Sequence, residues 1–198
     1  MKTELEAKWL DIDPRDIRTK LRAGGAALVH AEILMRRKNF DYPDKRLEKI
    51  GGWVRVRNEG KKITLSYKQL NDRTLHGTKE VAVIVDDFER TCEFLRDIGL
   101  REFAIQETRR EAWQLGSAEI VVDSWPWIPP FVEIESPDEP TLRRLAERLG
   151  LRWDESLHGS VEIAYQAYYD VTDQEIYNCP AVVFGPVPSW LAAKRKKQ

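Results

Sequence analysis

The sequence has few cysteines, histidines and methionines. Its 198 residues include two cysteines, three histidines and two methionines. Cys92 and Cys179 lie far apart and have neither a metal-ligand nor a redox spacing, so we expect no disulfide framework. His30, His76 and His158 occupy unrelated contexts, and we interpret them as surface or core residues rather than as metal ligands.

The sequence also lacks an excess of charge and a long apolar run. Lysine and arginine total 32 and aspartate and glutamate 33, which gives a net charge of −1. This balance argues against a nucleic-acid partner, because a nucleic-acid-binding surface is strongly basic. No segment approaches the roughly 18 apolar residues of a membrane-spanning helix, and the N-terminus does not resemble a signal peptide. We therefore predict a cytoplasmic protein without a membrane partner, and leave open whether it forms a homodimer.

Three segments have the apolar spacing of amphipathic helices. They cover residues 13–24, 86–99 and 136–150. Ser136 and Glu139 have the spacing of a capping box at the start of the third helix. Each helix carries an apolar stripe, which predicts that it packs on another surface.

Most of the other segments before residue 136 have strand patterns. The eight predicted strands cover 3–10, 28–41, 52–60, 61–70, 79–85, 101–115, 117–123 and 131–135. The predicted fold class is therefore α+β. We expect a single domain over residues 1–198, with a core at 1–170 and a C-terminal extension at 171–198. A helical pattern lies near 161–169, and we expect the basic residues at the C-terminus to be frayed.

Charged residues recur at every second position of these strands. Glu4, Glu6 and Lys8 share one face of the first strand, and Arg55 and Arg57 share one face of another. For any single strand, a half-exposed antiparallel sheet explains the pattern. A closed eight-stranded antiparallel barrel explains all of them together, because the helices then cover its apolar outside and the charges line its lumen. Such a lumen needs divalent metals for its carboxylates and a polyanion for its cations, since like charges repel strongly there.

A series of motifs follows this alternation along the chain. ELEAK comes first, and NFDYPDKRL, WVRVR, ITLSYKQL, KEVAVIVDD, RREAW and DSWPWIPPFVEIE follow it. In this order they resemble the CYTH superfamily, the triphosphate tunnel metalloenzymes, whose signature is ExExK. The resemblance covers residues 4 to about 150. Three departures change the charge: Arg37 stands where the family often has Asp or Asn, Thr108 stands where Lys is frequent, and Ala82 stands where a second carboxylate often follows Glu80.

The resemblance implies a metal-dependent enzyme that acts on a small triphosphate in the tunnel. We expect hydrolysis of inorganic triphosphate or a similar compound. The alternatives are a class IV adenylyl cyclase, which makes cyclic AMP and pyrophosphate from ATP, and a thiamine triphosphatase. A module that binds polyphosphate or nucleotides without turnover is a hypothesis of a different class, and the intact carboxylates argue against it.

The resemblance also implies the residues of the site. Mg²⁺ or Mn²⁺, which prefer oxygen ligands, would be held by Glu4, Glu6, Asp123, Glu133 and Glu135. The triphosphate would be bound by Lys8, Arg37, Arg55, Arg57, Lys68, Arg109 and Arg110.

Further roles follow for individual members of this set. Glu4, Glu6 and Lys8 would be catalytic, and Lys8 would orient or deprotonate a water molecule. Glu80 would be a metal ligand or would hold a neighbouring arginine, and we favour the second role. Arg109 and Arg110 point to opposite faces of a regular strand, so we expect one of them, Arg110, to enter the tunnel.

Overall fold

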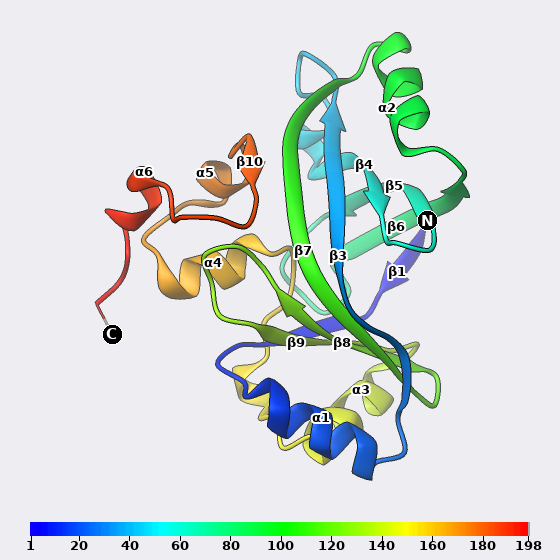
Figure 1. Ribbon diagram of the computed structural model, residues 1–198, viewed down its shortest axis with the longest axis vertical. Coiled ribbons are helices and arrows are strands. Elements are labelled where there is room, and N and C mark those ends of the chain that lie inside the picture. The colour runs from blue at the N-terminus through cyan, green and yellow to red at the C-terminus, as the bar shows by residue number, and fades with distance from the viewer. Residues whose placement is uncertain (198) are drawn as a thin grey trace.

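The computed structural model describes residues 1–197, and over these residues nine antiparallel strands form a nearly closed barrel (Figure 1). The order around the barrel is β1-β6-β5-β4-β3-β7-β8-β9-β2. The strands are β1 (Lys2–Glu4), β2 (Glu6–Trp9), β3 (Ala27–Asp41), β4 (Gly52–Asn58), β5 (Ile63–Leu70), β6 (Thr78–Val85), β7 (Arg101–Leu115), β8 (Ala118–Ser124) and β9 (Phe131–Glu135). This confirms the predicted antiparallel barrel with a charged lumen.

The strand count differs from the predicted eight because the N-terminal strand divides at Leu5. Before Leu5, β1 pairs with β6, and after it β2 pairs with β9. The backbone carbonyl of Leu5 accepts a hydrogen bond from the amide of Ser136 at 3.0 Å. One continuous segment therefore joins the two edges of the sheet, and its side chains Glu4 and Glu6 meet different neighbouring strands.

Helices cover part of the apolar outside of the barrel, as the sequence predicts, while Val81 and Val83 of β6 remain exposed. The helices are α1 (Pro14–Ala23), α2 (Phe88–Asp97), α3 (Glu139–Arg148), α4 (Glu162–Tyr168), α5 (Asp173–Tyr177) and α6 (Ser189–Ala192). Helices α1 and α3 lie together at one end of the molecule, against β8 and β9, and α2 lies at the other end (Figure 1). Ala7 and Trp9 of β2 pack in one cluster with Leu21 of α1 and Leu142 of α3. Cys92 of α2 is fully buried, as expected of a small core residue.

The start of α3 differs from the prediction. Asp138, not Ser136, is the N-cap, and its side chain accepts a hydrogen bond from the amide of Thr141 at 2.8 Å. The carboxylate of Glu139 pairs instead with Arg143. Both Ser136 and Asp138 are residue types that cap helices well, so sequence alone does not choose between them.

The C-terminal segment packs on the barrel more closely than the sequence suggests. Its elements α4, α5, α6 and β10 (Ala181–Val182) lie on the same side of the barrel as β7, and β10 pairs with β7 in parallel (Figure 1). The prediction of a frayed tail is wrong at Arg195, whose backbone forms an antiparallel β-bridge with Tyr169. The amide of Lys196 also donates a hydrogen bond to the carbonyl of Tyr168 at 2.9 Å. Gln198, the last residue of the predicted extension, lies outside the described residues. Within residues 1–197 no helix has the length and apolar character needed to cross a bilayer.

Replacing Leu142 with alanine should destabilise the protein, because Leu142 is 0% exposed in the cluster between α3 and the barrel. We expect the free energy of unfolding to fall by about 2–5 kcal/mol in urea denaturation. Leu34→Ala is the matched control, since Leu34 is 44% exposed on β3, and should cost less than about 1 kcal/mol. Equal losses in the two variants would contradict this assignment of the core.

Candidate active site

The alternation of the strands places the predicted charged residues around one cavity inside the barrel. The cavity has a volume of about 760 Å³. Its lining includes Glu4, Glu6, Lys8, Arg37, Arg55, Arg57, Lys68, Glu80, Arg110, Asp123, Glu133 and Glu135. Arg109 is the exception among the predicted residues. It is exposed on the outer face of β7, where its guanidinium lies 4.7 Å from the ring centre of Phe184, so the structure removes it from the tunnel.

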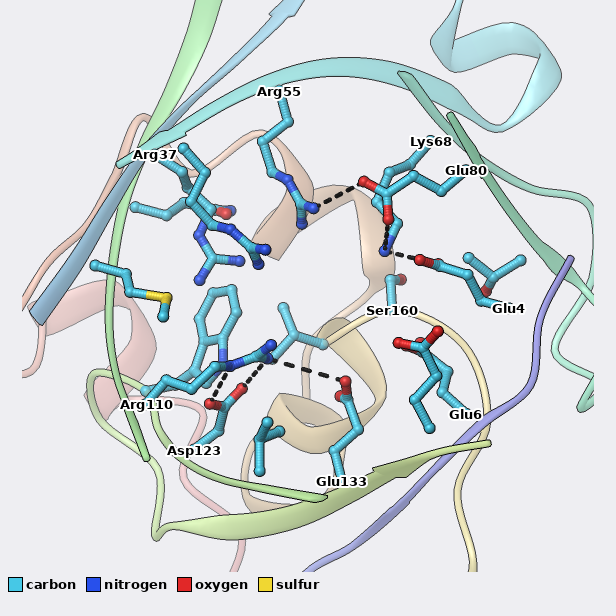
Figure 2. Close-up of a pocket in the computed structure, with 18 of the residues that line it drawn as sticks. Glu4, Glu6, Arg37, Arg55, Lys68, Glu80, Arg110, Asp123, Glu133 and Ser160 are labelled. Carbon is cyan, nitrogen blue, oxygen red and sulfur yellow. Dashed lines mark hydrogen bonds and ion pairs between the residues drawn. The ribbon is translucent and has the colours of Figure 1, made fainter. Parts of the chain in front are cut away.

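The arginines of the tunnel and most of its glutamates occupy different sides. Arg37, Arg55 and Arg110 lie together on one side in Figure 2, and they come from the neighbouring strands β3, β4 and β7. Glu4, Glu6 and Glu133 lie on the opposite side and come from β1, β2 and β9. The strand order therefore creates one wall that suits an anion and one that suits a cation.

Lys8 lies between two carboxylates on the acidic side. Its Nζ is 2.8 Å from Glu6 Oε1 and 3.1 Å from Glu133 Oε2. Burial acts to lower the pKa of Lys8, but the charges of Glu133 and Glu6 outweigh it, and the pKa lies above its ordinary value. Lys8 is therefore held as an ammonium ion between these two carboxylates.

A second network connects the acidic wall to the arginines. Lys68 Nζ lies 2.8 Å from Glu4 Oε2 and 3.3 Å from Glu80 Oε2, and Arg55 Nη2 donates to Glu80 Oε1 at 3.0 Å. Burial raises the pKa of Glu4, and its hydrogen bond with Glu80 raises it further. Burial also acts to raise the pKa of Glu80, but that hydrogen bond and the charges of Lys68 and Arg55 keep it below its ordinary value. Glu80 thus holds a neighbouring arginine, the arrangement that the sequence analysis favours.

Asp123 is bound on both oxygens by Arg110. The Nε of Arg110 donates to Oδ1 at 2.7 Å, and Nη2 donates to Oδ2 at 2.5 Å. Asp123 is 1% exposed, so this bidentate pair is shielded from solvent. Arg110 therefore satisfies both oxygens of Asp123 in this arrangement of the side chains.

Arg37 differs from the other tunnel cations because no carboxylate pairs with it over residues 1–197. It is 4% exposed, its Nη2 donates to Thr108 Oγ1 at 2.6 Å, and its Nε has no partner. Its guanidinium lies 4.7 Å from the ring centre of Trp125. Burial, followed by the charges of Arg57 and Arg55, lowers its pKa. A buried cation without a counter-ion is costly, so this wall of the tunnel is suited to an anionic ligand.

The opposite wall carries carboxylate oxygens, which are the type of ligand that a hard divalent cation prefers. Burial raises the pKa of Glu135, and the nearby charges of Glu6 and Glu133 raise it further, because these carboxylates crowd one another. A bound cation would relieve that repulsion. Lys8 and Lys68 lie between the carboxylate oxygens of this wall. In the described part of the chain no three His, Cys, Asp or Glu side chains are placed to hold a metal.

Several tunnel residues were not predicted from the sequence. Glu119 shares the lumenal face of β8 with Asp123, and the same alternation could have identified it. Glu59 follows β4 in a turn, and its side chain is only 8% exposed. Arg57 Nη2 donates to Glu59 Oε1 at 2.7 Å. Asn39 and Glu162 also line the cavity, and no charge alternation marks either of them.

Together, the fold and the site define a class of tunnel-shaped barrels whose lumen is charged and whose apolar side faces outward. The family model of the CYTH domain matches residues 2–158, and the chain belongs to this family. No curated protein matches it by sequence.

Solved structures share the fold at low sequence identity. A Vibrio parahaemolyticus protein described as an adenylate cyclase candidate has a TM-score of 0.70 at 15% identity, over 83% of this chain and 98% of that chain. A conserved hypothetical protein from Pyrococcus furiosus has a TM-score of 0.63 at 23% identity, over 78% and 94%. A Hippeastrum protein named as an adenylyl cyclase and described as having a dominant triphosphatase activity has a TM-score of 0.57 at 10% identity, over 89% and 95%.

Replacing Glu59 with glutamine should destabilise the protein in a pH-dependent way. Burial acts to raise the pKa of Glu59, but Arg57 and the hydroxyl of Thr64 bring it from 4.5 down to about 2. A lowered pKa contributes stability that is present above the unfolded-state pKa and is lost as the pH falls through the folded-state value. We expect a loss of about 1–3 kcal/mol in unfolding free energy near pH 6, shrinking between about pH 4.5 and 2.

Urea denaturation of the Glu59→Gln variant and the wild type at several pH values measures this difference. Glu147→Gln, on the exposed side of α3, is the matched control. A difference that stays constant from pH 6 to pH 2 would show that the ionised carboxylate of Glu59 does not support Arg57.

Proposed function

We propose that this protein hydrolyses a small triphosphate bound in the tunnel, with Mg²⁺ or Mn²⁺ as the metal. The observation that carries the proposal is the wall of buried arginines in which Arg37 has no carboxylate partner. A triphosphate supplies several negative charges at close spacing, and arginine binds phosphate oxygens through two parallel hydrogen bonds. The acidic wall opposite would hold the metal. Membership in the CYTH family supports both assignments.

The residues of each wall have distinct roles in this proposal. Glu4, Glu6, Glu133 and Glu135 would hold a divalent metal, and Asp123 a second one if Arg110 releases it. When bound, the metal would neutralise charge on the phosphate oxygens. Arg37, Arg55, Arg57 and Arg110, with Lys8 and Lys68, would bind and orient the phosphates and stabilise the charge that develops on the leaving group. Lys8 would also orient the attacking water.

Adenylyl cyclase activity is the second candidate, because a cavity of about 760 Å³ also leaves room for a nucleoside. In a cyclase, the same walls would place the α-phosphorus of ATP, rather than a terminal phosphorus, against the nucleophile. Hydrolysis of thiamine triphosphate is a third candidate, because the same cavity also has space for its organic part.

Product identification with purified protein should separate these reactions. Inorganic triphosphate, thiamine triphosphate and ATP are each incubated with Mg²⁺ or Mn²⁺, and EDTA serves as the metal-free control. We expect phosphate release that EDTA abolishes and that Glu133→Gln lowers by about 100-fold. Cyclic AMP and pyrophosphate from ATP would instead identify a cyclase. Tight triphosphate binding without any product would identify a binding module and overturn the proposal.

Replacing Arg37 with methionine should weaken triphosphate binding without destabilising the protein. The variant loses charge-assisted hydrogen bonds to the ligand, so we expect KM to rise by about tenfold or more. It also removes a buried cation that has no counter-ion, so the free energy of unfolding should be unchanged or higher.

Arg36→Met is the matched control, because Arg36 is the preceding residue of β3, its side chain is 67% exposed, and it pairs with Glu107. Enzyme kinetics and urea denaturation of both variants provide the two readouts. A loss of several kcal/mol in Arg37→Met with an unchanged KM would mean that Arg37 is structural.

A further inference from the structure

A short segment that follows α3 extends the sheet beyond β2, the last strand in the order around the barrel. We call this segment, residues 152–158, the strap. The amide of Lys8 donates to the carbonyl of Leu157 at 2.9 Å, and the amide of Leu157 donates to the carbonyl of Lys8 at 2.9 Å. The two residues form an antiparallel β-bridge. Lys8 is therefore held by β9 on one edge of its strand and by the strap on the other.

The strap also contacts β2 on either side of Lys8. Trp9 Nε1 donates to the carbonyl of Arg152 at 2.7 Å, and the Nδ1 of His158 lies 3.3 Å from the carbonyl oxygen of Glu6. Because a carbonyl oxygen can only accept a hydrogen bond, Nδ1 is the donor in this contact. The strap therefore contacts three of the four residues of β2.

The ring of His158 takes the place of a backbone partner for Glu6. Since Lys8 pairs with Leu157, a regular antiparallel strand would bring Gly159 opposite Glu6. Gly159 has a φ of +102°, a conformation that glycine adopts readily, and the chain leaves the strand direction there. The strap backbone thus ends before it reaches the carbonyl of Glu6, and the imidazole supplies the missing donor.

The ring of His158 is itself held in place by the strap. Its Nε2 lies 3.4 Å from Ser156 Oγ, which donates to the carbonyl of Trp153 at 2.7 Å. The ring centre lies 6.0 Å from that of Trp153, which meets the ring of Trp9 edge to face at 6.1 Å. These contacts orient the donor of His158 toward the carbonyl of Glu6.

The residues that the strap holds belong to the acidic side of the tunnel. Glu6 and Glu133 lie together on that side in Figure 2, and Lys8 Nζ lies between their carboxylates, 2.8 Å from Glu6 Oε1 and 3.1 Å from Glu133 Oε2. Under the proposed function, Glu6 holds a metal and Lys8 orients the attacking water. A displacement of about 1 Å in such a group can lower a reaction rate by about 100-fold.

We propose that His158 is a positioning residue, which holds Glu6 and Lys8 in place for the reaction through the carbonyl of Glu6. This inference rests on the proposed function. His158 is not among the described residues that line the cavity, so it acts through the backbone of β2 and does not touch the substrate. The arginines that would bind the triphosphate lie on the opposite side of the tunnel. Loss of the His158 donor should therefore lower kcat more than it changes KM.

Three substitutions separate this contact from general packing. His158→Leu removes both ring nitrogens, His158→Asn keeps a donor near the position of Nδ1, and His158→Gln keeps a polar group near Nε2. At saturating Mg²⁺, with whichever of inorganic triphosphate, thiamine triphosphate and ATP the wild type converts fastest, we expect kcat to fall at least about tenfold in the Leu and Gln variants. KM should stay within about twofold, and His158→Asn should recover most of the loss. His76→Leu, exposed in the loop after β5, is the matched control and should retain both constants.

Hydrogen exchange of backbone amides tests the same contact without turnover. The amides of Ala7 and Lys8 should exchange at least about tenfold faster in His158→Leu and His158→Gln than in the wild type and His158→Asn. The midpoints of urea denaturation should stay within about 0.5 M of one another, since the change is confined to β2.

Each outcome decides between positioning and other roles. Unchanged kcat in His158→Leu would overturn this inference and leave the proposed function intact. A lower kcat that His158→Asn does not restore, or faster exchange throughout the molecule, would assign a general structural role to His158 and also overturn it. If His158→Leu does not fold, the comparison of His158→Asn with His158→Gln still decides. Absence of product from the wild type with all three triphosphates would overturn the proposed function, and exchange at Ala7 and Lys8 would then decide whether His158 holds β2.

Discussion

Compensation of buried charge is the constraint on which the rest of this structure depends. A barrel with charges inside can fold only if each cation and carboxylate that leaves water finds an opposite charge or a hydrogen-bond partner. The strand order meets most of this demand, because it brings Lys8 between Glu6 and Glu133 and sets Arg110 against Asp123. Arg37 is the tunnel cation for which the described chain supplies no carboxylate, and its Nε also has no hydrogen-bond partner, so Arg37 marks where an anionic ligand is needed.

The same constraint moves the hydrophobic core to the outside of the barrel. Ala7 and Trp9 alternate with Glu6 and Lys8, so every lumenal charge on β2 leaves an apolar neighbour that α1 and α3 must cover. Within the cavity wall, Phe131 and Trp125 pack with Tyr165 of the C-terminal segment. That segment thus serves both as part of the core and as one end of the tunnel. A change in its packing would reach the site directly.

Alternation on several strands together indicated a barrel with charges inside, because the face that a side chain takes is a local property with a period of two residues. The family resemblance then supplied most of the expected lumenal residues. Arg109 and Arg110 illustrate the limit of that step, because both were expected to bind the triphosphate although only one of two adjacent strand residues can face inward. Pairing partners are not local: nothing in ELEAK shows that β1 joins β6 while β2 joins β9. Glu162 lies on a helix of the C-terminal segment, where no charge alternation exists, so only the packing of that segment could reveal it.

The ion pairs within the tunnel also constrain how a ligand could enter. Lys8 and Lys68 now occupy the carboxylates that would hold a metal under the proposed function. A metal alone would leave two buried ammonium groups without partners, and a triphosphate alone would bring its charge toward crowded carboxylates. With both bound, Lys8 and Lys68 would turn from the carboxylates to the phosphates, the carboxylates would hold the metal, and every charge would remain paired. Under the proposed function, this arrangement of charges favours joint binding of metal and triphosphate over binding of either one alone.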